Sequence, residues 1–241
     1  MATPNLTLHH LQIGQGERIP WLLEELNLPY KLATYKRSPL LSPPELKALH
    51  PLGASPVLED HTDALRPVKL AESGAITEYL IHKYGNGKLA LAPEDKSFAD
   101  YLYWFHFANA TLQPALFRRA MLRGAIPNAE SDMRYLGACD RVNRALAHLN
   151  DRLLKNDWLA GEEFTAADVM TGWCVTTMRM FAPIDLSAYE GILGWVKRFS
   201  GREAYRRAMA KCDPELDLEE TTSARGPKVI ELFVKAMAGK M

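Results

Sequence analysis

Short apolar runs alternate with helical segments through the first ninety residues. Strands are expected at residues 6–11, 30–35, 56–60 and 68–71, and helices at 17–26 and 73–83. Pro20 falls in the first turn of the first helix, where proline is tolerated, and Gly85 ends the second. The order is βαβ followed by ββα, which predicts an α/β, thioredoxin-like N-terminal domain over residues 1–86.

The pattern becomes helical after a connector that contains Gly87 and Pro93. Helices are expected at residues 98–122, 132–154, 165–181, 192–199 and 203–211, then a polar, extended arm at 213–227 and an amphipathic terminal helix at 229–237. The first two helices exceed the average length, which suits a bundle whose paired long helices carry a dimer axis. We therefore predict an all-α C-terminal helical bundle over residues 95–241.

The composition narrows the class of protein. The 241 residues are 47% hydrophobic, and 29 basic side chains balance 29 acidic ones. This balance gives no electrostatic sign of a nucleic-acid partner, and no apolar run approaches the roughly 20 residues that span a bilayer. The N-terminus lacks the basic stretch and long apolar core of a signal peptide, so a cytoplasmic protein without a membrane partner is expected.

The cysteines are Cys139, Cys174 and Cys212, which are widely spaced and form no CxxC pair. Structural disulfides and a zinc site are therefore not expected, and the sequence shows no convergent set of metal ligands. His9 and His10, on the first predicted strand, are assigned to packing and hydrogen bonding, without a chemical role.

The most informative stretch begins at Gly53 and ends at Leu80. A Ser55-Pro56 bond opens a strand there, and a cis bond at this place would leave the backbone N–H and C=O of Ser55 available to an extended peptide ligand. Glu72 and Ser73 stand at the start of the following helix, where unpaired N–H groups favour anions. A carboxylate beside a hydroxyl and free amides can hold both charges of an α-amino acid.

These pieces resemble the glutathione S-transferase family, and the likeness covers nearly the whole chain. The matching motifs are the Ser-Pro strand, the Glu-Ser-x-Ala-Ile helix start, the strand–helix–strand opening of fungal and bacterial members, and a helix capping box at Thr165-Ala166-Ala167-Asp168. The resemblance implies a glutathione-binding first domain and a second domain for substrate binding and dimerisation. It assigns glutathione binding to Ser55, Pro56, Glu72 and Ser73.

The position of the family's catalytic serine is occupied by Gly14 when the chain is aligned on Arg18-Ile19. No Ser, Tyr or Cys lies between Thr7 and Tyr30. We therefore assign thiol activation to Gly14, Gln15 and Gly16, because an amide side chain and backbone N–H groups at a helix start can donate hydrogen bonds to a thiolate. The alternative interpretation is a flexible turn in a protein that no longer catalyses.

The aromatic segment around His106 resembles the long helix of the same subgroup. His106, Asn109, Gln113 and Phe117 follow helical spacing, so they are expected to share a face and to bind the hydrophobic substrate. Packing of a satisfied histidine among core aromatics is an equally good interpretation.

Three functions remain open at this point. The first is a dimeric enzyme that adds the thiolate of glutathione, as co-substrate, to a small hydrophobic electrophile, such as a fungal biosynthetic intermediate. The second is cis–trans isomerisation, in which glutathione acts as a catalyst. The third is a non-enzymatic interaction or regulatory protein with this fold. Glutaredoxin-like chemistry is disfavoured, because no cysteine stands at the start of the first helix.

Overall fold

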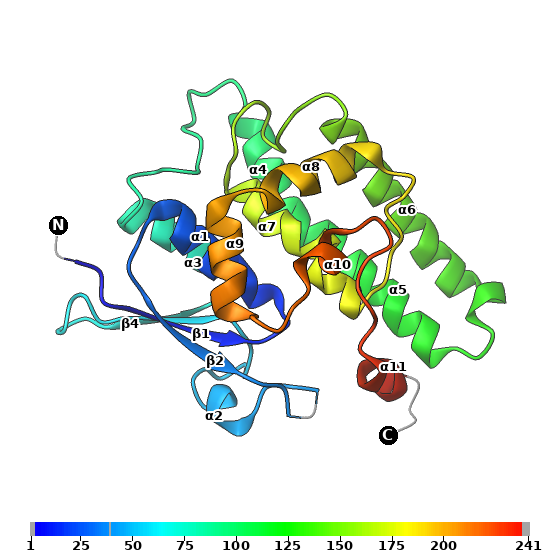
Figure 1. The fold of residues 1–241 in the computed structure, drawn as a ribbon, viewed down its shortest axis with the longest axis horizontal. Coiled ribbons are helices and arrows are strands. Elements are labelled where there is room, and N and C mark those ends of the chain that lie inside the picture. Colours follow the sequence, from blue (N-terminus) through cyan, green and yellow to red (C-terminus); the bar gives the residue numbers. More distant parts are fainter. Residues whose placement is uncertain (1–2, 39, 238–241) are drawn as a thin grey trace. The chain divides into compact units, whose positions relative to one another are not determined.

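The structure is a computed structural model that describes residues 3–38 and 40–237. The chain forms two compact units (Figure 1). The first contains the residues up to 95 together with 200–216, and the second contains 96–199 together with the residues from 217 onward. No helix in the described ranges is both long and apolar enough to cross a membrane.

The first unit is built on a four-stranded mixed sheet. Its strands are β1 (Leu6–Leu11), β2 (Lys31–Tyr35), β3 (Val57–Asp60) and β4 (Val68–Ala71), in the order β2-β1-β3-β4. β1 and β2 are parallel, which requires a crossover, and α1 (Arg18–Leu26) provides it. The β3–β4 hairpin is antiparallel and leads into α3 (Ser73–Lys83). The predicted α/β, thioredoxin-like domain is therefore confirmed.

The helix α9 (Glu203–Cys212) packs against α1 within the first unit, although about a hundred residues separate it from the rest of that unit. The rings of Trp21 and Tyr205 meet edge to face, with centroids 4.9 Å apart. Arg202 donates two hydrogen bonds, of 2.6 and 2.7 Å, to the buried carboxylate of Glu25. The pattern predicted one uninterrupted domain over 95–241, whereas these contacts place Ser200–Leu216 in the first unit.

The second unit is helical. Its helices are α4 (Phe98–Phe107), α5 (Gln113–Ala125), α6 (Met133–Leu153), α7 (Ala166–Val175), α8 (Glu190–Ser200), α10 (Leu218–Thr222) and α11 (Glu231–Met237). Every residue of α7 is buried, and its start carries the predicted capping box. Thr165 Oγ1 accepts the N–H of Ala167, and Asp168 accepts the N–H of Thr165 at 2.9 Å. The all-α bundle is confirmed.

Three segments differ from the pattern. The expected helix over 98–122 contains a π-helical segment at Ala108–Leu112, because the chain there inserts an additional residue into the turn. The helix expected over 165–181 ends at Val175 and continues as a 3-10 turn, Thr177–Met180. The expected extended arm contains α10, because the side chain of Asp217 caps the N–H groups of Glu219 and Glu220.

Candidate functional site

The turn between β1 and α1 holds Gly14, Gln15 and Gly16. Gly14 is extended, with φ −163° and ψ 169°, and a 3-10 turn, η1 (Gln15–Glu17), follows it and runs into α1. A Cβ atom on Gly16 would lie 2.7 Å from His10 Nδ1 and 3.2 Å from Ser55 Oγ. Only glycine permits this close approach, which brings the turn against both β1 and the Ser55 segment.

The Ser55-Pro56 bond is cis, as the sequence predicted. Ser55 Oγ accepts the backbone N–H of Leu11 at 2.9 Å, which fixes the segment against the end of β1. The Gln15 amide donates to the Ser55 carbonyl at 3.5 Å. The residue assigned to thiol activation therefore lies beside the residue assigned to the peptide backbone of the ligand.

Arg18 connects the turn to the start of α3. Its guanidinium donates to Ser73 Oγ at 3.1 Å and to Gln15 Oε1 at 3.4 Å, and the side chain is fully buried. Glu72 precedes Ser73, is exposed, and takes a left-handed backbone conformation with φ 68°. The structure thus brings Gln15, Ser55 and Ser73 together, although they are far apart in the sequence.

Arg18 enters the sequence motif only as the residue on which the chain aligns with the family, and its contribution to the site was not predicted. An arginine in the first turn of a helix stands at the positive end of the helix dipole. Its positive charge is unfavourable there unless another group accepts hydrogen bonds from it, so the position of Arg18 indicated that such a partner exists.

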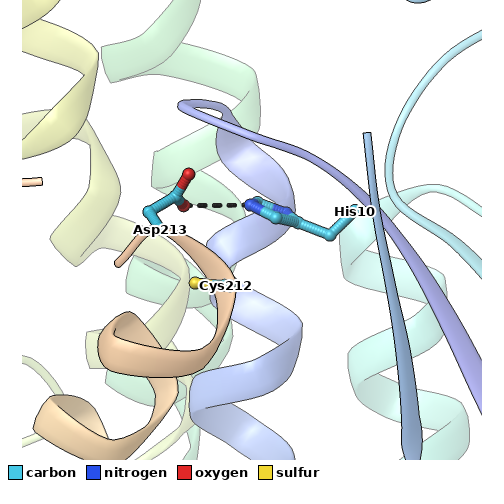
Figure 2. Close-up of side chains that lie close together, drawn as sticks. All are labelled: His10, Cys212 and Asp213. Atoms are coloured by element: carbon cyan, nitrogen blue, oxygen red, sulfur yellow. Dashed lines mark hydrogen bonds and ion pairs between the residues drawn. The ribbon is translucent and has the colours of Figure 1, made fainter. Parts of the chain in front are cut away.

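His10, Cys212 and Asp213 form a buried cluster (Figure 2). His10 Nε2 is 2.9 Å from Asp213 Oδ2, and the N–H of Ile13 donates to Asp213 Oδ1 at 2.7 Å. Cys212 completes the cluster, and burial, followed by the charge of Asp213, raises the pKa of its thiol well above the ordinary value. His10 therefore makes a buried hydrogen bond to a carboxylate that lies 203 positions away, which no local pattern predicts.

The same cluster supplies three atoms of metal-ligand type that lie within 4.8 Å of one another. The sequence showed no convergent ligands, because Cys212 and Asp213 lie on α9 and its end whereas His10 lies on β1. Both carboxylate oxygens of Asp213 already accept hydrogen bonds from protein groups. A cation would have to replace the His10 bond.

His9 points to the other face of β1. Its Nδ1 is 2.9 Å from the hydroxyl of Tyr35, and its Nε2 is 3.5 Å from Glu59. The hydrogen bond from Lys69, on the neighbouring strand, is the first cause that lowers the pKa of Glu59 to about 2. His9 therefore makes a hydrogen bond within the first unit, in keeping with the packing and hydrogen-bonding role predicted for it.

The predicted substrate residues lie along α4, the π-helical segment and α5. His106 is exposed, whereas Asn109, Gln113 and Phe117 are partly buried. Phe117 approaches Trp173 with ring centroids 6.4 Å apart. The assumed common face requires an unbroken α-helix, and the π-helical segment interrupts that spacing between the second and third residues.

Cavities of about 540 and 590 Å³ lie among the described residues of the second unit. The first is lined by small residues of α5 and α6 and by Arg118, Arg134, Arg141 and Arg144. The lining of the second cavity includes His148, whose ring stacks on Trp104 with ring centroids 5.0 Å apart. Neither cavity includes the four predicted substrate residues.

Comparison with known proteins adds an independent observation to this geometry. A family model described as the glutathione S-transferase N-terminal domain matches residues 15–83, and one for the C-terminal domain matches residues 115–198. Glutathione S-transferase 3 of Schizosaccharomyces pombe is 31% identical over 86% of this chain and 88% of its own length. The chain belongs to the glutathione S-transferase family.

Other relatives extend the glutathione S-transferase likeness. The disulfide-bond oxidoreductase YfcG of Escherichia coli is 30% identical over 86% of this chain and 95% of its own length. Among solved structures, a glutathione S-transferase from Actinobacillus pleuropneumoniae has a TM-score of 0.75 and 28% identity, and covers 86% of this chain and 93% of its own. A glutathione transferase from Burkholderia graminis, solved with two glutathione molecules per subunit, shares the fold with a TM-score of 0.70, at 23% identity over 87% of this chain and 89% of its own. These relatives support a glutathione S-transferase-like function.

Proposed function

We propose that this protein is a glutathione transferase that binds glutathione across the β1–α1 turn, Ser55 and Ser73, and adds its thiolate to a small hydrophobic electrophile. The observation that carries the proposal is the pair of bonds from buried Arg18, to Gln15 and to Ser73. These bonds join the expected thiol site to the expected γ-glutamyl site within one unit.

The main chain of Ser55 pairs with the cysteinyl part of glutathione in this proposal, and Glu72 and Ser73 hold the γ-glutamyl end. Ser73 is the first residue of α3, so the γ-glutamyl carboxylate meets backbone N–H groups and the positive end of a helix dipole. In this proposal the exposed Glu72 receives the ammonium group. Pro56, which is buried, fixes the cis turn that presents Ser55.

Thiol activation falls to Gly14, Gln15 and Gly16. Each interaction of a helix terminus with a charge contributes about 0.3–1 kcal/mol when exposed and up to about 2 kcal/mol when partly buried. Because about 1.4 kcal/mol changes an acid constant tenfold, these donors lower the pKa of the thiol enough to give a usable thiolate fraction. The thiol proton leaves to water, a sulfur lone pair forms the S–C bond, and the displaced electron pair goes to the leaving group or the conjugated acceptor of the electrophile.

His106, Asn109, Gln113 and Phe117 are the proposed contacts for the electrophile. The partly buried ring of Phe117, which lies beside the buried Trp173, provides apolar surface of the kind that such a substrate requires. Asn109 lies in the π-helical segment at Ala108–Leu112, and π-helical turns are frequent at functional sites.

The active form is proposed to be a homodimer. Large apolar side chains are exposed on the long helices of the second unit, namely Leu102, Tyr103, Met121, Met133 and Leu136. A second copy of the chain would cover them. Light scattering at micromolar concentration should give twice the chain mass of 27.1 kDa, and a monomer mass would contradict this part of the proposal.

Glutathione-dependent disulfide reduction is the second candidate. The relative YfcG, which is named as a disulfide-bond oxidoreductase, supports it at 30% identity. Two glutathione molecules would supply both thiols, so that one disulfide is reduced to two thiols while one glutathione disulfide forms. This reaction needs no cysteine of the protein, which suits a first helix that lacks one.

The deciding experiment combines calorimetric titration of glutathione with product analysis by mass spectrometry. Conjugation of an activated aryl chloride yields a product that gains the mass of glutathione and loses that of HCl. Isomerisation of a conjugated substrate leaves its mass unchanged, and disulfide reduction yields glutathione disulfide. Ser73→Ala should weaken glutathione binding by about 1–3 kcal/mol, because a buried partner is left unpaired. Ser131→Ala, an exposed serine of the second unit, is the matched control. Absence of binding to the wild-type protein would refute the proposal.

A further inference from the structure

Ile13 has a backbone conformation that its side chain disfavours. Its φ is 54°, in the left-handed region, where a β-branched residue is strained. The residue stands directly before Gly14, so its conformation sets the direction in which the turn leaves β1. Strain of this kind persists only where the surroundings hold it, which raises the question of what holds Ile13.

Two side chains from distant segments hold the peptide groups on either side of Ile13. Its N–H donates to Asp213 Oδ1 at 2.7 Å. Its carbonyl accepts from Arg37 Nη2 at 2.5 Å, and the same guanidinium donates to the carbonyl of Leu40 at 2.8 Å. The burial of Arg37 lowers its pKa, whereas the charge of Asp213 acts in the opposite direction.

The other oxygen of Asp213 holds the strand from which the turn departs. Because a carboxylate oxygen accepts, His10 Nε2 carries the hydrogen of their 2.9 Å bond. Nδ1 has no hydrogen-bond partner among the described residues and lies against Gly16. One buried carboxylate therefore fixes the last part of β1 through His10 and the strained residue through Ile13.

We propose that Asp213 is a positioning residue for the thiol site: it holds Ile13 in the left-handed conformation and thereby aims the backbone amides of Gly14–Gly16 at the sulfur of glutathione. The inference rests on the proposed function. Asp213 itself touches neither glutathione nor the electrophile in this proposal, and it acts through the turn. The placement of α9 in the first unit thus has a role beyond packing, since α9 brings Asp213 to the turn.

The test compares Asp213→Asn with Glu215→Gln, which removes a carboxylate two residues further along. Glu215 is exposed and forms a 3.3 Å surface pair with Lys36. The readout is the pKa of the bound thiol, from thiolate absorbance as glutathione-loaded protein is titrated with base. Asp213→Asn should return this pKa to that of free glutathione and lower kcat/KM about tenfold, the lower part of the range expected from loss of a strained backbone state. Glutathione affinity should change less than twofold, and Glu215→Gln should match the wild type.

A rescue variant separates positioning from general damage. Glycine adopts a positive φ without strain, so Ile13→Gly in the Asp213→Asn background should restore at least half of the lost shift in thiol pKa. The double variant also serves if Asp213→Asn alone does not fold. Arg37→Gln, which removes the bond to the Ile13 carbonyl, should raise the thiol pKa in the same direction as Asp213→Asn.

Each contrary result has its own meaning. An unchanged thiol pKa in Asp213→Asn, or failure of Ile13→Gly to restore it, would overturn the positioning role while glutathione binding stands. A wild-type protein that does not bind glutathione would overturn the proposed function and this inference with it. About one zinc ion per chain, measured by elemental analysis of the wild type, would also overturn it, because the cation would take the Asp213 and His10 atoms that form the present bond.

Discussion

The first backbone N–H groups of a helix need hydrogen-bond acceptors, and the start of α7 and the turn before α1 differ in how they are supplied. Both follow an extended residue, Thr165 in the one and Gly14 in the other. At α7 the Thr165 side chain and Asp168 satisfy the first N–H groups from within four residues. At Gly14 no side chain caps the helical segment, and the support comes from Asp213, about 200 positions later. A closed helix start stabilises the fold, whereas an open one leaves N–H donors for a ligand.

The largest expected effect concerns the closed start. Asp168 is fully buried and accepts hydrogen bonds from Leu159, Thr165 and Trp195, while burial raises its pKa to about 6. Asp168→Ala should lower the free energy of unfolding by about 3–5 kcal/mol, because several buried donors lose their acceptor. Urea denaturation measures this loss. Asp132→Ala, which removes the cap of α6 at a far more accessible site, should cause a much smaller loss of unfolding free energy. Equal losses in the two variants would contradict the special importance of the buried cap at α7.

A side chain added at Gly16, in the turn before α1, should destabilise the protein. Gly16→Ala places a Cβ atom against His10 Nδ1, so the free energy of unfolding should fall by about 1–3 kcal/mol through overpacking. The bound thiol should lose part of its acidity at the same time, as absorbance titration would record. A stable variant with an unaltered thiol would show that the close approach is unnecessary.

An exposed glycine supplies the matched control for Gly16. A Cβ atom on Gly137, in α6, would meet nothing within 4 Å. Gly137→Ala should therefore raise the free energy of unfolding by about 0.5–1 kcal/mol, because alanine restricts the unfolded chain and favours the helix. Thermal denaturation followed by circular dichroism would test the sign. A destabilised variant would weaken the inference from open space at a glycine.

The smallest expected effect is the pH-dependent stability contributed by Glu59, the partner of His9. His9 faces Glu59, whose pKa lies at about 2 instead of 4.5, chiefly through Lys69. A lowered carboxyl pKa gives stability that is present above pH 4.5 and lost as the pH falls toward 2. The difference in urea midpoint between the wild type and Glu59→Gln should therefore shrink between pH 6 and about 2.5. A difference that is constant with pH would contradict this assignment.

The sequence predicted the features that depend on near neighbours. Thr165 and Asp168 stand three residues apart, so the capping box was visible, and the bounds of α3 followed from Ser73 and Gly85. The cis Ser55-Pro56 bond followed from a proline at a strand start within a familiar motif.

Features that depend on distant partners were not predicted. Nothing near Asp213 marks it as the partner of His10 and Ile13, because the pairing exists only once α9 lies against the β1–α1 turn. Arg18 was visible as a residue, but its bond to Ser73 spans 55 positions. The π-helical segment has no pattern in apolar spacing that distinguishes it from the α-helix on either side.

The return of α9 to the first unit has a consequence for synthesis. The ribosome completes the sheet, α1 and α3 first, but α9 emerges only after about a hundred further residues. At roughly 5–20 residues per second, the surface of α1 that Tyr205 later covers stays uncovered for about 5–20 s. The unit whose translation begins first therefore stays incomplete until residues 200–216 have been made, and a nascent chain stopped before residue 200 leaves Trp21 without its cover by Tyr205.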